Sequence, residues 1–163
     1  MSRSSPNETS TVKVEGERTL QAPREVVWSV LNDPAQMAAL MPGVQSFEVH
    51  DDRRWSAKVQ VPLGLGSLAL SFDFEKTEER ELEFAALKAK GNGVGAMIGL
   101  ETQFTLEPVD DATRMLWAAD LSVAGPVGSM GQRVLQPIVK QQVQQVLGAL
   151  EKRVAAAQSA AQS

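Results

Sequence analysis

The chain has 163 residues, of which 43% are hydrophobic and 22% charged, and its net charge is -4. This composition is typical of one soluble globular domain with a core, or a core with a cavity, and the negative charge argues against nucleic acid as a partner. The absence of cysteine excludes disulfides, thiol nucleophiles and cysteine metal ligands.

No apolar run approaches the ~20 residues needed to cross a bilayer, and no secretory segment opens the sequence. We therefore expect a soluble, cytoplasmic protein. Peripheral contact with the inner face of the membrane is left open.

The first forty residues predict one strand and two short helices. Residues 1–10 are small and polar, and we expect them to be disordered. Residues 11–21 alternate between apolar and polar side chains, which is the pattern of a strand. Both helices begin near a proline, and Asp33 can cap the second one ahead of Pro34. The pair Pro42–Gly43 ends the segment, so the helices predict a small clasp rather than a layer.

From Gly43 to Gly125 the sequence mostly follows the period of two that strands have. Glycines, prolines and acidic pairs separate the apolar runs, and one turn is expected at residues 78–80. Each run has one apolar and one polar face, which is typical of an antiparallel sheet covered on one side. The predicted strands cover residues 44–50, 55–63, 68–75, 82–89, 97–107 and 115–124.

A helical period follows Gly125–Pro126 and continues to about Ala157. Apolar residues recur every three or four positions and form one stripe of a helix that would be roughly 45 Å long. Pro137 removes one backbone hydrogen bond inside this helix. It predicts either a bend over a curved sheet or a hinge that lets residues 130–135 act as a gate. The stripe comprises Val127, Met130, Val134, Leu135, Ile138, Val139, Val143, Val146, Leu147, Leu150 and Val154.

Together these elements predict an α+β fold with a curled antiparallel sheet of about seven strands, two short helices after the first strand and one long C-terminal helix. We expect one domain over residues 11–157 and a disordered tail over residues 158–163. The strands offer the only large surface against which the helical stripe can be buried.

Polar residues give few candidates for chemistry. His50 with Asp51 and Asp52 could ligate a metal, but the three lie at a predicted hairpin tip, where aspartates are turn formers. The run Gly91–Gly95 precedes a strand rather than a helix, which favours a bulge or hinge over a phosphate site. The alternation of the strands places their carboxylates, such as Glu101, on the outer face of the predicted sheet. We therefore expect no catalytic residue, no metal and no cofactor.

The inward face of the sheet could be solid core or the wall of a cavity. Only one helix is available to fill the curl, and the inward positions include the small residues Ala57, Thr102 and Ala119, which favours a cavity for a flat or chain-like apolar molecule. The candidate lining residues are Leu40, Met41, Val59, Val61, Leu70, Phe72, Phe84, Ile98, Leu100, Phe104, Trp117, Val134, Leu135 and Ile138.

Four segments together resemble the CoxG family of carbon monoxide dehydrogenase subunits, within the START-like (SRPBCC) helix-grip superfamily. The resemblance covers roughly residues 12–154. The segments are LQAPREVVWSVLNDPAQMAALMPGV (20–44), KVQVPLGLGSLAL (58–70), AKGNGVGA (89–96) and GPVGSMGQRVLQPIVKQQVQQ (125–145).

This resemblance implies a hydrophobic-ligand cavity between the sheet and the long helix. It also implies association with a molybdenum-containing CO dehydrogenase or a related hydroxylase, by membrane recruitment or quinone exchange. Some members of the family continue into a membrane-seeking tail, whereas this chain ends in the weakly apolar AAAQSAAQS.

Three functional hypotheses follow. The first is a non-enzymatic carrier of a quinone or lipid-like molecule for that enzyme. The second is an assembly adaptor that binds no ligand. The third is a cyclase or hydratase of the same fold, which would need a carboxylate inside the cavity.

Overall fold

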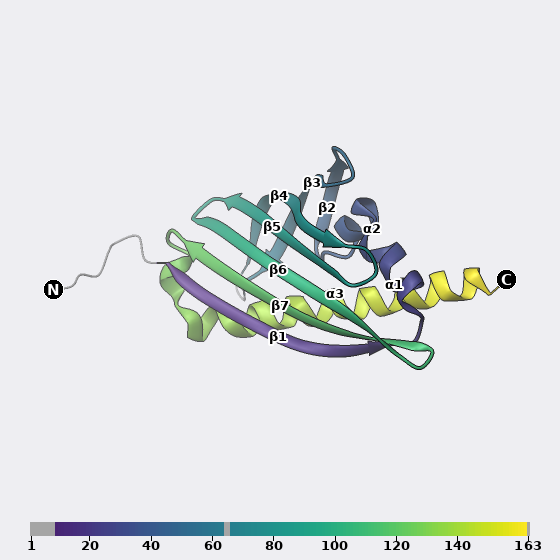
Figure 1. Cartoon of the computed structure of the whole chain (residues 1–163). Coiled ribbons are helices and arrows are strands. Elements are labelled where there is room, and N and C mark those ends of the chain that lie inside the picture. Colours follow the sequence, from purple (N-terminus) through teal and green to yellow (C-terminus); the bar gives the residue numbers. More distant parts are fainter. Residues whose placement is uncertain (1–8, 64–65, 163) are drawn as a thin grey trace.

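Seven antiparallel strands form one sheet that curls around a single long helix, as the sequence predicts (Figure 1). The computed structural model describes residues 9–63 and 66–162. The elements are β1 (Ser10–Leu20), α1 (Arg24–Leu31), α2 (Pro34–Ala39), β2 (Val44–Val49), β3 (Arg54–Pro62), β4 (Ser67–Arg80), β5 (Phe84–Gly93), β6 (Ala96–Val109), β7 (Ala112–Ala124), the 3₁₀ turn η1 (Gly128–Met130) and α3 (Gln132–Ala161).

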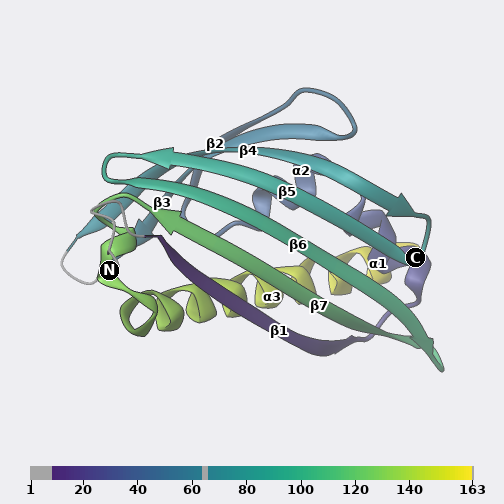
Figure 2. The same ribbon diagram turned by 60° about the vertical axis from the view of Figure 1, so that its left-hand side comes forward.

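The strands follow the order β1-β7-β6-β5-β4-β3-β2, and every neighbouring pair is antiparallel. From β2 to β7 each strand pairs with the next along the chain, whereas β1 pairs with β7. Figure 2 shows α3 running beneath the sheet beside β1, with α1 and α2 near its C-terminal half. The sheet therefore encloses α3 from one side, and the helices lie on its inner face.

The joint between α1 and α2 forms as the sequence predicts, and it is tied to the sheet by a buried lysine. The Asp33 carboxylate accepts a hydrogen bond of 3.0 Å from the Ala35 backbone N–H, and Pro34 follows it at the first helical position. Lys76 on β4 is only 5% exposed, and its Nζ donates to Asn32 Oδ1 and, over 2.9 Å, to Glu79. These bonds satisfy the buried ammonium and hold the clasp against the sheet.

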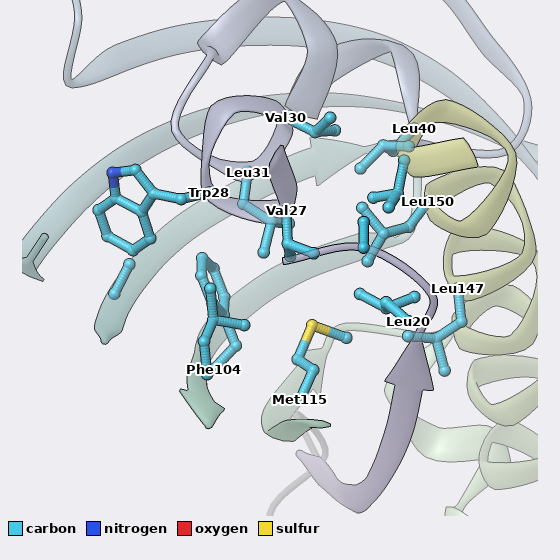
Figure 3. Close-up of a cluster of buried hydrophobic side chains, with 14 residues drawn as sticks. Leu20, Val27, Trp28, Val30, Leu31, Leu40, Phe104, Met115, Leu147 and Leu150 are labelled. Carbon is cyan, nitrogen blue, oxygen red and sulfur yellow. The ribbon is translucent and has the colours of Figure 1, made fainter. Parts of the chain in front are cut away.

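Around α1, the inner face is solid core. The α1 side chains pack between β6, β7 and the C-terminal half of α3 (Figure 3). The Trp28 and Phe104 rings meet edge to face at 6.5 Å, and Leu20 and Leu150 are almost fully buried. This cluster fixes α3 against the sheet at one end.

The turn after β4 lies later than the sequence predicts. β4 continues to Arg80, and the chain turns around Leu82, which has a positive φ of 67°. A register shift between Lys76 and Glu78 leaves Thr77 of β4 without a partner on β5. Along β5 the inward positions are Ala85, Leu87 and Ala89, so Ala85 is buried, whereas Phe84 faces outward under the Arg80 guanidinium at 4.6 Å.

The long helix is also displaced from its predicted limits. Residues 128–130 form the turn η1, and Gly131, with a φ of 84°, redirects the chain so that α3 begins at Gln132 rather than at Val127. α3 then continues to Ala161, beyond the predicted end at residue 157, and Pro137 lies inside it. The predicted disorder of residues 1–10 falls largely on residues 1–8, which lie outside the described residues, and Ser10 already belongs to β1.

We predict that Leu150→Ala lowers the free energy of unfolding by about 2–5 kcal/mol, because it leaves a cavity in the core that fixes α3. Urea denaturation measures the change. Val109→Ala is the control, since Val109 is 42% exposed, and a surface substitution shifts stability by about 0.5 kcal/mol or less. Equal effects of the two substitutions would contradict the packing described for α3.

Candidate functional site: an apolar cavity under the sheet

A cavity of about 310 Å³ lies between the inner face of the sheet and α3. Strands β3 to β7 supply most of its wall, α3 supplies the opposite side, and Leu31, Met37 and Met41 come from the clasp. Several residues of the core around α1, among them Phe104 and Leu150, also line it. The solid cluster in Figure 3 therefore borders the cavity on that side.

The cavity follows from side-chain size as well as from curvature. Thr102 on β6 and Ala119 on β7 are direct cross-strand partners, and both line the cavity. Two small side chains next to each other leave space where two large ones would have met. Ala57, the third small residue expected here, is buried at 3% exposure but contributes nothing to the wall among the described residues.

The predicted lining residues come together in the structure, with two exceptions. Phe84 faces outward because the inward positions of β5 are Ala85, Leu87 and Ala89, and Val134 is 43% exposed because α3 begins at Gln132 and turns this position to solvent. The other predicted residues all line the cavity: Leu40, Met41, Val59, Val61, Leu70, Phe72, Ile98, Leu100, Phe104, Trp117, Leu135 and Ile138.

The prediction missed part of the wall. Trp55 and Phe74 stack with ring centroids 5.4 Å apart, and both line the cavity. The alternation of apolar and polar residues in β3 and β4 places Trp55 and Phe74 on the inner face, so the sequence pattern could have identified both residues. Leu87 is harder to place because apolar residues occupy both phases of β5 from Phe84 to Leu87. On α3 the wall continues through Val139, Val143 and Leu147, which belong to the predicted helical stripe.

Few polar groups reach this cavity, and none of the described lining side chains is ionisable. The Thr102 hydroxyl donates to the Ala118 carbonyl at 2.8 Å and keeps its oxygen lone pairs as acceptors. The Trp117 Nε1 is buried and, within the described part of the chain, has no hydrogen-bond partner. A buried unpaired donor costs about 1–3 kcal/mol, and the Trp117 N–H is such a donor, on the side of the ring that packs against Gly16 of β1.

Two glycines make room for the aromatic rings of the wall. A Cβ atom on Gly16 would lie 2.9 Å from Cζ2 of Trp117, and one on Gly91 would lie 2.6 Å from Cε1 of Phe72. Neither position tolerates a side chain without moving its ring. The Phe72 ring therefore explains why position 91 in β5 is a glycine. The chain turns only after β5, at Val94 and Gly95.

The outer face and the hairpin tips carry the charged residues. His50 follows β2, with its Nε2 2.8 Å from the Ser56 hydroxyl, and the Asp51 carboxylate accepts from the Arg53 N–H as a turn former. Glu101 and Asp120 are exposed cross-strand neighbours on the outer side. Over residues 9–63 and 66–162 no group of three His, Cys, Asp or Glu residues is arranged to hold a metal ion.

Comparison with protein-family models decides the family. The model for CoxG, a subunit of carbon monoxide dehydrogenase, matches residues 16–155, which is most of the chain. The protein belongs to the CoxG family. The match begins at Gly16 and includes both helices of the clasp, every strand from β2 to β7 and most of α3. No curated protein matches this CoxG-family chain in sequence.

Solved structures confirm the START-like fold. A conserved protein from Geobacillus kaustophilus aligns with a TM-score of 0.81 at 23% identity, covering 88% of this chain and 95% of its own. A START superfamily protein from Mycobacterium smegmatis aligns with a TM-score of 0.66 at 18% identity, covering 88% and 97%. The Zhui aromatase/cyclase from a Streptomyces species aligns with a TM-score of 0.65 at 15% identity, covering 89% and 94%. At these identities the similarity shows the fold alone.

The helices of the CoxG-family chain do not match the requirements of a bilayer crossing. Within the described part of the chain, none combines the necessary length and hydrophobicity. α3 has the length, with 30 residues, but its exposed side carries Gln, Lys, Arg and Glu.

We predict that Ala119→Leu changes the free energy of unfolding by less than about 1 kcal/mol, because the cavity accepts the added methylene groups. Ala85→Leu is the matched control: Ala85 is buried at 3% exposure in the solid core and does not line the cavity. Overpacking there should cost about 1–3 kcal/mol. Urea denaturation of both variants checks the difference, and equal destabilisation would mean that the space beside Ala119 is filled.

Proposed function

We propose that this CoxG-family protein is a non-enzymatic carrier that holds a quinone or lipid-like molecule in the cavity between the sheet and α3. In this role it serves a molybdenum CO dehydrogenase-type enzyme, by delivering the quinone or by recruiting the enzyme to the membrane. The observation that carries the proposal is an apolar cavity without an ionisable side chain among its described lining residues.

The size and character of the cavity suit an apolar ring with part of a chain. A volume of about 310 Å³ lies at the lower end of the range for small-molecule sites. Burial of roughly 200 Å² of apolar ligand surface would contribute about 5 kcal/mol before the cost of ordering the ligand. Burial alone therefore supports binding, and a longer ligand would leave its tail outside.

The polar groups favour a ligand with acceptor oxygens over a plain hydrocarbon. Trp117 carries one unpaired N–H, buried beside Gly16 of β1, and a small rotation of the ring would bring it to a quinone carbonyl, an acceptor that would satisfy it. The large flat surfaces of Trp55, Phe72 and Trp117 suit a planar ring. A quinone combines both properties.

The cyclase alternative needs an acid or base at the ligand. The solved structures of this fold include an aromatase/cyclase and a norcoclaurine synthase, so the fold itself is compatible with catalysis. The described cavity wall of this chain, however, offers only Thr102, Gln103, Gln142 and Trp117 as polar side chains. None of them titrates near neutral pH, which favours a carrier.

The partner is inferred from the family, whose name is that of a subunit of carbon monoxide dehydrogenase. The family match is the support for this part of the proposal. Affinity purification of the tagged chain from its native cells, followed by mass spectrometry, tests it. Recovery of a molybdenum hydroxylase supports the proposal, and its repeated absence under gentle conditions counts against it.

Organic-solvent extraction of the freshly purified protein, followed by mass spectrometry, tests the carrier function directly. The expected result is a quinone or another apolar molecule in a near-stoichiometric amount. Protein that is repeatedly empty and takes up no added menadione would leave the adaptor hypothesis as the better one.

We predict that Trp117→Phe weakens the binding of menadione, a two-ring quinone, by roughly fivefold, which is the loss expected for one hydrogen bond. Equilibrium dialysis measures the affinity. The same substitution should leave the binding of naphthalene, which has no acceptor oxygen, unchanged within about twofold. Trp28→Phe is the control variant, since Trp28 does not line the cavity. Equal losses for the two probes would show that only ring packing has changed.

A further inference from the structure

The two edges of the sheet differ in how far they are covered. β1 forms one edge, and α3 packs against it, with the Gln132 side-chain amide donating to the Thr11 carbonyl. β2 forms the other edge, and within the described part of the chain it pairs only with β3. Every residue of β2 from Gln45 to Val49 is exposed. Figure 1 shows the end of β2 at the β2–β3 hairpin extending past α2.

The free side of β2 presents backbone groups at alternate residues. The His50 N–H donates to the Arg54 carbonyl at 3.0 Å, so these two residues form a hydrogen-bonded pair of the β2–β3 ladder. Such pairs alternate along an antiparallel ladder, and the register gives the next one to Glu48. The N–H and C=O groups of Phe47 and Val49 therefore point away from β3, toward the open side.

Apolar side chains accompany this open edge. Phe47 and Val49 are the cross-strand partners of Ala57 and Trp55, which are buried in the core. They lie on the same inner face, yet Phe47 is 44% and Val49 is 42% exposed. Neither belongs to the described wall of the cavity. The inner face thus ends at β2 in an uncovered apolar strip that the proposed carrier function does not use.

The edge lacks most of the features that keep an exposed strand from pairing with another chain. Such strands usually carry lysine, proline or inward-pointing charges, whereas β2 has the sequence VQSFEV. Its one irregularity lies between Val44 and Ser46, and the pairing with β3 is regular from there to Val49. Residues 34–49 contain one charged side chain, Glu48, although 22% of the whole chain is charged. Little charge therefore opposes the approach of a second copy of the chain at this edge.

We propose that β2 pairs in antiparallel orientation with β2 of a second copy of this chain, across a twofold axis at Phe47. In this register Phe47 lies opposite its own counterpart, and the two rings can pack against each other on the inner face. Glu48 lies opposite Ser46 of the second copy, whose hydroxyl can donate to the carboxylate. Val49 lies opposite Gln45 of the second copy.

The other registers are less favourable. The backbone groups on the open side of both copies have to meet, which allows an axis at residue 46, 47 or 48 near the middle of the strand. An axis at Glu48 would place two carboxylates directly opposite each other, which destabilises the pair. An axis at Ser46 would place Val49 opposite Gly43 of the second copy, which lies before β2 begins. The axis at Phe47 therefore pairs both exposed apolar residues within β2 and opposes no like charges.

Twofold pairing closes the assembly at two copies. The β1 edge of each chain is packed against α3, and both β2 edges are used in the dimer. Two short strands bury less than the roughly 1,000 Å² that a stable interface needs. We therefore expect a reversible dimer that forms at high protein concentration.

Disulfide trapping tests the register, since the chain has no cysteine of its own. The two Phe47 positions would form a hydrogen-bonded pair with Cα atoms about 5.5 Å apart, which is within the range of a disulfide. Under mild oxidation Phe47→Cys should cross-link on the order of tenfold faster than Val109→Cys, a control of similar exposure on β6, away from β2. Glu48→Cys is the register control, since its two copies would lie about 8 Å apart and should cross-link as slowly as Val109→Cys.

Sedimentation equilibrium measures the association without a cysteine. The wild-type chain should show a concentration-dependent dimer, and Phe47→Lys should weaken the association on the order of tenfold, because lysine on an edge strand opposes pairing. Val109→Lys should associate as the wild type does, and both variants should keep the wild-type melting curve. A chain that stays monomeric up to millimolar concentration, or a dimer that survives Phe47→Lys, would overturn the proposal.

Two further outcomes would also contradict it. Equal cross-linking of Phe47→Cys and Glu48→Cys would indicate random collisions rather than the proposed register. A monomeric chain that captures a molybdenum hydroxylase, and loses this capture in Phe47→Lys but not in Val109→Lys, would assign the edge to a protein partner instead of a second copy.

Discussion

The structure depends on one mismatch: a single helix has to cover the inner face of a seven-stranded, curled sheet. The helix α3 packs against β1, α1 and η1, near one edge of the sheet. The clasp covers part of the face near β2 and β3. Beneath the central strands the side chains must fill the remaining space themselves, and at Thr102 and Ala119 they are too small to do so. The cavity is the result of this incomplete cover.

The same mismatch explains the division between stability and function. Leu20, Val27 and Leu150 form a solid core at the α1 end, where three layers of side chains meet. The cavity continues from that core toward the η1 end, where glycines allow close backbone contacts and the chain changes direction at Gly131. The core around α1 therefore holds α3 against the sheet, and under the proposed function the η1 end would serve ligand exchange.

Periodicity in the sequence was enough to predict the α+β class, the strand order along the chain, the capped start at Asp33 and most of the cavity wall. It could not decide which phase of β5 faces inward, because apolar residues occupy both phases from Phe84 to Leu87, and this placed Phe84 on the wrong face. It also extended the helical stripe back to Val127, since the left-handed conformation at Gly131 that separates η1 from α3 leaves no mark in the apolar spacing. The cavity was inferred from small inward-facing residues and from the family resemblance. A pattern of apolar residues shows which side chains are buried, but it does not show whether they leave a space between them. The unpaired Trp117 N–H depends on tertiary contacts alone.

The central claim is that an apolar ligand occupies the space between the sheet and α3. Intermolecular nuclear Overhauser effects between menadione and the methyl groups of the protein test it most directly. Contacts are expected from the quinone methyl and ring protons to Ala119 on β7 and Ile138 on α3, two residues that line opposite sides of the cavity. Contacts confined to the outer face of the sheet would contradict it.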